Sequence, residues 1–150
     1  MTNVTKLLIQ YKFVSNKLMF FLNFYSMRKY NDVELHLLNI QIGCILRLAR
    51  LKKKLSQHNL SILLGYNAIM IGRVERFENV SGWDKIFSIS QQLDVDYCSL
   101  FILKSKDTLI SIVDESFKLE EKLTEEKKHY YNFLKKTILI KFDLLDKQNS

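Results

Sequence analysis

Residues 57–76, QHNLSILLGYNAIMIGRVER, decide the fold of this chain. Ser56 stands just before this stretch, and its hydroxyl can cap the N-terminus of a helix that runs to about residue 64. Gly65 follows at the point where a left-handed residue commonly ends a helix. Asn67 can cap a second helix that reaches about Arg76. The stretch therefore predicts two short helices joined by a tight turn.

Two helices joined so closely pack well only if certain positions are small or apolar. Ser61 is small at the position where the second helix must cross the first. The residues expected to point inward and lock the pair are Leu60, Leu64, Ile71 and Val74. This pattern is typical of a helix-turn-helix, in which the second helix enters the major groove of DNA.

Further helices are predicted on both sides of the pair. From Ile40 the apolar residues form one broad helical face, with arginines and lysines around it. A looser segment covers residues 77–82, and another helix is expected over 83–93. Asp96 can cap a short helix that ends near Phe101. The central part of the chain therefore predicts five helices.

Residues 104–150 carry a different pattern. We expect one helix over 107–123 and a second that begins after Thr124, where acidic residues occupy the first turn. The second helix has one apolar stripe, formed by Tyr130, Leu134, Ile138, Phe142 and Leu145. Such a stripe is more often core or dimer interface than the wall of a ligand pocket.

The composition favours helices and a basic surface. The chain of 150 residues has no proline and four glycines, which leaves few turns for an all-β fold. The formal net charge is +7, and the basic excess lies in the first half of the chain. A basic face suits a polyanion such as DNA, because bound counterions are released on binding. A merely solvated basic surface is an alternative of about equal weight.

Cysteine usage and the N-terminal residues bear on where the protein works. Cys44 and Cys98 lack metal-ligand neighbours, and we interpret both as buried free thiols in a reducing cytoplasm. The apolar run 18–25 is too short to span a membrane and lacks a signal-peptide cleavage site. Translation from Met27 and a genuine N-terminal helix packed on the domain are two equal alternatives for this region.

The sequence resembles the lambda-repressor/Cro-like (Xre) family of bacterial and phage regulators from about Gln41 to Phe101. The residues that carry the resemblance, in order, are Ile42-Gly43 opening the first helix, Leu48-x-Arg50, Leu55-Ser56-Gln57, Leu60, Gly65, Ile71, Arg73-Val74-Glu75-Arg76, Leu93-x-Val95 and Leu100-Phe101. The resemblance implies an all-α, five-helix, repressor-like DNA-binding domain over residues 40–103. An N-terminal extension (1–39) and a helical C-terminal segment for dimerisation (104–150) would flank it.

The resemblance also implies a role for each matching position. Ser56 and Gln57 would meet the DNA backbone and the first base. The residues of the second helix that would face base edges are Asn67, Ala68, Ile69, Gly72 and Arg73. The arginine of this group would be the main reader, because a guanidinium can pair with both major-groove acceptors of guanine. Arg76 is a further DNA-binding candidate, and Arg50 with Glu75 would form a structural ion pair.

Several positions depart from the family pattern. Apolar residues replace the usual polar ones at Ile62, Leu63, Ala68, Ile69 and Met70. Gly72 should loosen its helix, Phe77 stands where the family prefers glycine, and the proline that commonly opens the fourth helix is missing. An exposed apolar patch usually marks an interface. The alternative function is therefore a protein-interaction module, such as an antitoxin or adaptor, with weakened DNA reading.

No enzymatic chemistry is indicated. His36, His58 and His129 are scattered, without the spacing of metal ligands, and there is no glycine-rich phosphate loop. We therefore expect no enzyme, no metal and no cofactor. The sequence predicts a cytoplasmic transcriptional regulator without a membrane segment, which binds double-stranded DNA as a homodimer.

Overall fold

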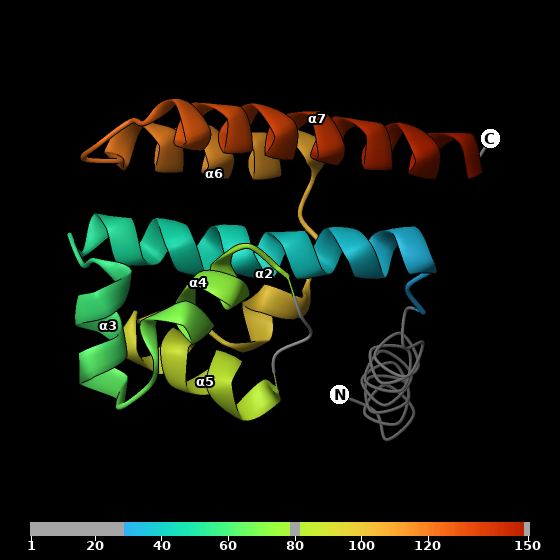
Figure 1. Ribbon diagram of the computed structural model, residues 1–150. Helices are drawn as coiled ribbons and strands as arrows, with labels where there is room; N and C mark the ends of the chain where they lie inside the picture. Colours follow the sequence, from blue (N-terminus) through green and yellow to red (C-terminus); the bar gives the residue numbers. More distant parts are fainter. Residues whose placement is uncertain (1–28, 79–81, 149–150) are drawn as a thin grey trace, which may run out of the picture. The chain divides into compact units, whose positions relative to one another are not determined.

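The computed structural model describes residues 29–78 and 82–148, and all the regular structure in these residues is helical. The elements are α2 (Asp32–Lys52), α3 (Gln57–Leu64), α4 (Ala68–Glu75), α5 (Trp83–Gln92), the 3-10 helix η1 (Cys98–Phe101), α6 (Lys106–Leu119) and α7 (Glu125–Gln148) (Figure 1). The all-α prediction is confirmed for these residues. The predictions for the apolar run 18–25 and for a start at Met27 lie outside them.

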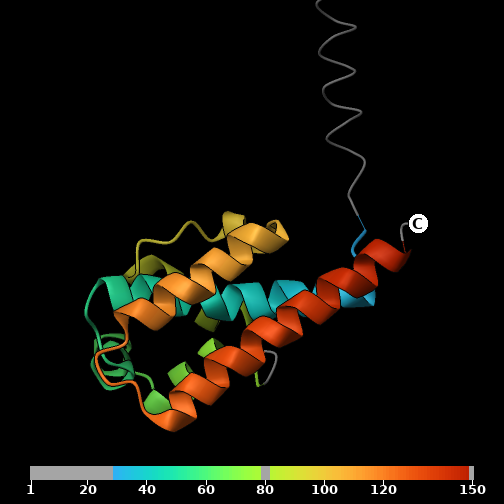
Figure 2. The same cartoon turned by 90° about the horizontal axis from the view of Figure 1, so that it is seen from above.

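Helix α2 lies between two layers of helices. On one side are α3, α4, α5 and η1, and on the other are α6 and α7. Seen from above, α6 and α7 both cross over α2 (Figure 2). The chain from Asn31 onward forms one compact unit.

Helix α2 begins at Asp32, earlier than the predicted start at Ile40. Asn31 caps it reciprocally with Glu34: the amide N of Glu34 donates to Asn31 Oδ1 at 2.9 Å, and the amide N of Asn31 donates to a Glu34 carboxylate oxygen at 3.0 Å. This capping box satisfies two otherwise unpaired backbone N–H groups. Consequently Gly43 lies in the middle of a helix instead of near its opening.

Each of the two layers has its own apolar core, and α2 contributes to both. The N-terminal core contains Ile42, Leu46, Leu60, Ile71, Val74, Ile89, Leu93 and Leu100. The C-terminal core contains Leu37, Ile40, Cys44, Leu109, Val113, Tyr131, Leu134, Ile138 and Leu145. The predicted stripe of α7 is therefore core, with Tyr130 and Phe142 partly buried at its edge. As a result, α2 is buried on two opposite faces.

The pair α3 and α4 forms as the sequence predicts. The Oγ atom of Ser56 accepts a hydrogen bond from the amide of Asn59 at 2.9 Å, and Gly65 ends α3 with a φ of 65°. Asn67 Oδ1 accepts from the amide of Ile69 at 2.8 Å and caps α4. Leu60, Ser61, Ile71 and Val74 are buried, whereas Leu64 is only partly so.

Gly43 allows α2 and α4 to approach closely. A Cβ atom at this position would lie 2.8 Å from the carbonyl oxygen of Glu75 and 2.9 Å from that of Val74. Both atoms belong to the backbone, so neither can move aside without displacing the end of α4. The absence of a side chain at Gly43 therefore fixes how α4 sits against α2.

Phe77 adopts a left-handed backbone conformation, which glycine adopts most readily. Its φ is 48°, and a non-glycine residue there costs about 1–3 kcal/mol. The Phe77 ring packs against the C-terminal core, and burying such a side chain contributes a stabilisation of similar size. The packing of Phe77 against the C-terminal core thus offsets the strain of its backbone.

The C-terminal helices differ slightly from their predicted bounds. Ser105 caps α6, which ends at Leu119 instead of residue 123, because the backbone of Glu120 is extended. Thr124 Oγ1 accepts from the amide of Lys127 at 3.3 Å, as its position predicts. Asp96 Oδ2 accepts from the amide of Ser99 at 3.0 Å at the start of η1.

The two cysteines do not share one environment. Both thiols are free, and Cys44 is buried, but Cys98 is exposed, contrary to the prediction. Cys98 lies at the start of the 3-10 helix, whose single buried residue is Leu100.

Among the described residues, no helix is both long and apolar enough to cross a membrane.

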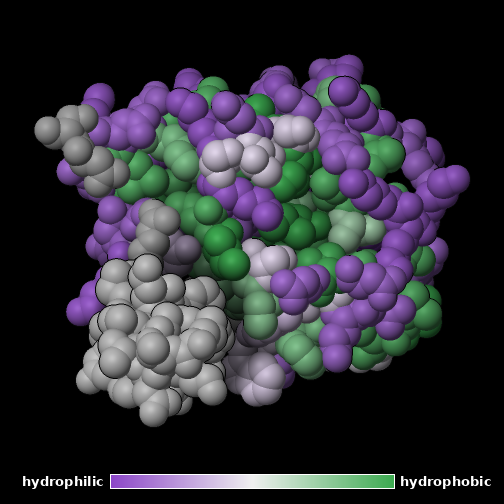
Figure 3. Space-filling model, turned by 180° about the vertical axis from the view of Figure 1, so that it is seen from behind, coloured by the Kyte–Doolittle hydropathy of each residue, from purple (hydrophilic) through white to green (hydrophobic). Residues whose placement is uncertain are grey.

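Apolar side chains also reach the surface. Seen from behind, they gather toward the middle of the face, with hydrophilic residues along its upper and right-hand edges (Figure 3). The large apolar side chains that are exposed include Leu35, Ile62, Leu63, Ile69, Trp83, Ile102, Phe133, Ile140 and Leu144. They occur in both layers, so apolar exposure is not confined to α3 and α4.

Candidate nucleic-acid interface

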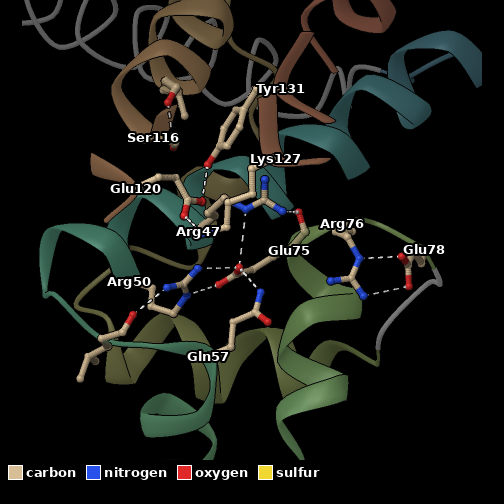
Figure 4. A network of polar contacts seen from close by, with 12 residues as sticks. Arg47, Arg50, Gln57, Glu75, Arg76, Glu78, Ser116, Glu120, Lys127 and Tyr131 are labelled. Atoms are coloured by element: carbon tan, nitrogen blue, oxygen red, sulfur yellow. Dashed lines mark hydrogen bonds and ion pairs between the residues drawn. The ribbon is translucent and has the colours of Figure 1, made fainter. Parts of the chain in front are cut away.

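A buried charged network holds α4 against its neighbours (Figure 4). The carboxylate of Glu75 accepts from Arg50 Nε at 2.5 Å and from Arg50 Nη2 at 2.9 Å. Gln57 Nε2 donates to the same carboxylate at 2.8 Å, and Arg47 Nε lies 3.5 Å from it. The pairing of Arg50 with Glu75 joins α2 to α4, and Gln57 adds the first residue of α3.

The part of the network around Glu75 contains two guanidinium groups but only one carboxylate. Arg47 is the more weakly paired of the two, and aromatic rings compensate for its burial. Its guanidinium carbon lies 4.5 Å from the centre of the Tyr130 ring and 5.6 Å from that of Tyr131. A cation over an aromatic face is stabilised by the ring quadrupole, most strongly away from water. Arg47 therefore connects α7 to the carboxylate of Glu75 on α4.

The same network continues to the turn between α6 and α7. Tyr131 Oη donates to Glu120 Oε1 at 2.8 Å, and Lys127 forms an ion pair with Glu120. Burial raises the pKa of both Tyr130 and Tyr131, so both phenols are neutral at ordinary pH. The turn is thus anchored to α7 by neutral and charged contacts, and sequence reasoning did not connect it to the site.

The residues expected to face DNA are not equally available. Arg73 and Ile69 are exposed on α4, and Ala68 is partly exposed. Ser56 and Asn67 are also exposed, but their side-chain oxygens already cap helices. This leaves Arg73 as the charged member of the set on the open face of α4.

Gly72 and Arg76 differ from the expectation for base-facing residues. Gly72 is buried, because a Cβ atom there would lie 2.9 Å from Arg76 Nη1 and 3.2 Å from Gln57 Oε1. Arg76 is only partly exposed and pairs with Glu78, with Nε 2.6 Å from Oε1. The hydrogen bond from Arg76 lowers the pKa of the Glu78 carboxyl group. Gly72 therefore lies beneath neighbouring side chains instead of on an open helix face.

The apolar patch on α3 and α4 is smaller than the sequence suggests. Ile62, Leu63 and Ile69 are each more than half exposed, whereas Met70 packs against the N-terminal core. Trp83, at the start of α5, is 71% exposed. Sequence reasoning did not single out Trp83 as an exposed apolar residue, although it predicted that a helix starts there, directly after Gly82.

A cavity of about 1000 Å³ opens between the end of α2, the start of α3 and the α6–α7 turn. Its basic lining residues are Arg47, Arg50, Lys52, Lys54, Arg76, Lys122 and Lys127. Three glutamates, at positions 120, 121 and 126, line the side formed by the turn and the start of α7. Ser56 and Gln57 also line it, so the N-terminus of α3 opens into a predominantly basic hollow.

The described residues contain no cluster of the kind that binds metal ions. Within 29–78 and 82–148, no three histidine, cysteine, aspartate or glutamate side chains gather in a way that could hold a metal ion.

Comparison with family models, with curated proteins and with solved structures found no match to this chain.

Proposed function

We propose that this protein is a cytoplasmic transcriptional regulator that binds double-stranded DNA with sequence specificity. In this proposal α2, α3, α4, α5 and η1 make up a repressor-like five-helix domain, with α3 and α4 as its helix-turn-helix. Helix α4 enters the major groove, and the chain acts as a homodimer. The domain needs no cofactor for this role.

The observation that carries the proposal is the combination of a rigidly held α4 with an exposed arginine on it. The turn at Gly65 and the buried pair of Arg50 with Glu75 fix α4 against α2 and α3. Arg73 remains exposed, at a position where its guanidinium can reach the paired acceptors of guanine. A base-reading side chain needs such a supported helix, because specificity depends on its precise position.

Phosphate contacts are supported by the basic cavity at the start of α3. The N-terminus of a helix favours anions, because its free N–H groups and its dipole point toward them. Ser56 and Gln57 stand at this end of α3, and Lys54 lies beside them in the cavity lining. A DNA backbone beside this end of α3 would bring one phosphate to these groups while α4 lies in the groove.

The proposal is tested by measuring binding of the full chain to duplexes, first selected from a random pool and then titrated at several salt concentrations. Binding should weaken as salt rises, because phosphate contacts release counterions. Arg73→Ala should reduce the preference for the selected sequence by about 1–3 kcal/mol for each lost bidentate contact. Lys54→Ala, the matched control on a phosphate-facing residue, should weaken binding to all duplexes alike and lower the salt slope.

Two results would contradict the proposal. One is the absence of salt-sensitive binding to any duplex by a chain whose helical circular dichroism is intact. The other is an Arg73→Ala variant that keeps the full sequence preference of the wild type. Either result would leave α4 without a role in reading bases.

A second candidate function is a protein-interaction module built on the same two helices. The observation that favours it is the exposure of Ile62 and Leu63 on α3, which form no part of a polar DNA-contacting surface. Under this candidate, Ile62→Gln combined with Leu63→Gln abolishes binding to the protein partner while the helical content stays unchanged. Duplex binding would then be absent in the wild type as well, which separates the two functions.

A further inference from the structure

Helix α7 has a second apolar face that the C-terminal core does not use. Leu134, Ile138 and Leu145 point into that core. Phe133 is 68% exposed, Ile140 49% and Leu144 41%. These three residues are separated by seven and then four positions, so they lie on one face of the helix. We call Phe133, Ile140 and Leu144 the outer stripe.

We propose that two copies of this chain pair through their outer stripes, with the two α7 helices antiparallel. A bare stripe that includes a phenylalanine exposed over two thirds of its surface is unusual for a monomer and typical of an interface. A second copy is a suitable occupant, because a twofold axis lets one patch serve both sides of the contact. This inference deepens the proposed function and rests on it only for the homodimer that DNA half-sites require.

The charges on the same face of α7 specify the direction of pairing. Glu126 lies near the start of the helix, seven residues before Phe133, and Lys147 lies near its end, seven residues after Ile140. Both side chains are exposed. A twofold axis between positions 136 and 137 sets Phe133 opposite Ile140 of the second copy. The same axis sets Glu126 opposite Lys147, so each end of the contact carries an ion pair.

Parallel pairing of the same stripes lacks this complementarity. It would set Glu126 opposite its own counterpart and Lys147 opposite its own counterpart, so both ends would repel. In the antiparallel pair, one basic residue at the edge of the stripe, Lys136, comes close to its symmetry mate. Its long stem can cover apolar surface while its amine turns outward into water.

The pairing would give the regulator two DNA-binding domains. Each copy would contribute one α4, and a twofold relation between the copies matches the symmetry of two DNA half-sites. Because the outer stripe lies on α7, it leaves the exposed Arg73 of α4 outside the contact. Glu126, at the end of the contact, also lines the basic cavity.

The first experiment is sedimentation velocity on the full chain without DNA, over a concentration series. We expect a concentration-dependent dimer for the wild type and a monomer for Phe133→Glu, with helical circular dichroism and melting temperature unchanged because Phe133 is outside the core. Leu139→Glu is the matched control. Leu139 is also exposed on α7, but it lies on a different face, so this variant should still dimerise.

The second experiment tests the antiparallel register by exchanging charges. Glu126→Lys alone and Lys147→Glu alone should each raise the dimer dissociation constant several-fold, because each creates two repulsive contacts. The double variant should restore the wild-type constant, since every pair is again opposite in sign. In a parallel dimer the double variant would show no such rescue.

A chain that stays monomeric over the concentration series overturns the proposal and leaves the stripe to another occupant, such as residues 1–28 or an unrelated protein. A dimer that survives Phe133→Glu, or a double variant without rescue, overturns it equally. Duplex binding by Phe133→Glu is measured separately. A monomer that still binds a half-site shows that DNA binding stands whatever the fate of the interface.

Discussion

At the residue scale, Glu75 on α4 is a carboxylate buried between two arginines. The carboxylate of Glu75 is contacted by Arg47, Arg50 and Gln57. An exposed ion pair contributes little to stability, but removing one partner of a buried pair leaves an uncompensated charge. The value of Glu75 to the fold therefore lies in its pairing with two buried arginines.

Glu75→Gln should lower the free energy of unfolding by about 3–5 kcal/mol, because both arginines would lose their only buried carboxylate partner in the described network. Urea unfolding followed by circular dichroism measures this. Asp94→Asn is a suitable control, since Asp94 pairs with Lys53 on the surface and asparagine tolerates its left-handed φ of 55°. If the two variants lose a similar free energy of unfolding, the buried network around Glu75 contributes no more to stability than an exposed ion pair does.

Cys44 gives a pH-dependent prediction. Burial raises the pKa of its thiol from 9.0 to about 12. Below pH 9 both the folded and the unfolded chain keep the proton, so its contribution is fully present. Above pH 9 the unfolded chain ionises first, and stability falls by about 1.4 kcal/mol per pH unit until the folded thiol also ionises.

The comparison between the wild type and Cys44→Ala isolates this effect. Any stability advantage of the wild type at pH 7 should shrink steadily as the pH rises from 9 toward 12. A difference between wild type and Cys44→Ala that stays constant with pH would rule out a buried thiol at this position.

At the element scale, the two helical glycines make opposite predictions for the same substitution. Gly43→Ala should destabilise the protein by about 1–3 kcal/mol, because its Cβ would meet backbone oxygens of α4 at 2.8 and 2.9 Å. Gly72→Ala should be neutral or stabilising by up to about 1 kcal/mol, because its Cβ would meet only the movable ends of Arg76 and Gln57. Thermal melts of both variants check the order, and a reversed order would contradict the close packing of α2 on α4.

Local signals at this scale were readable from the sequence. The caps at Ser56 and Asn67 and the left-handed Gly65 predict α3 and α4 correctly, because each satisfies backbone groups within its own few residues. The end of α6 was less predictable. Glu120 is extended where it bonds Tyr131 across the turn to α7, and no local pattern shows a contact of that kind.

At the scale of the whole molecule, the sequence indicated which faces are apolar but not which faces meet. The apolar stripe of α7 was visible, but its burial against α2 and α6 depends on contacts between residues far apart in the chain. The candidate site shows the same limit. The pairing of Arg50 with Glu75 was predicted from the resemblance in sequence, whereas the rings over Arg47 and the glutamates lining the cavity come from α7 and the turn before it.

The position of α2 between two cores has a consequence for synthesis on the ribosome. Residues up to 103 leave the ribosome first, and they can assemble α3, α4, α5 and η1 against one face of α2. The other face, with Leu37, Ile40 and Cys44, stays bare until α6 and then α7 have emerged. During that interval the nascent chain displays an apolar helix surface, which is the kind of surface that chaperones bind and that promotes aggregation.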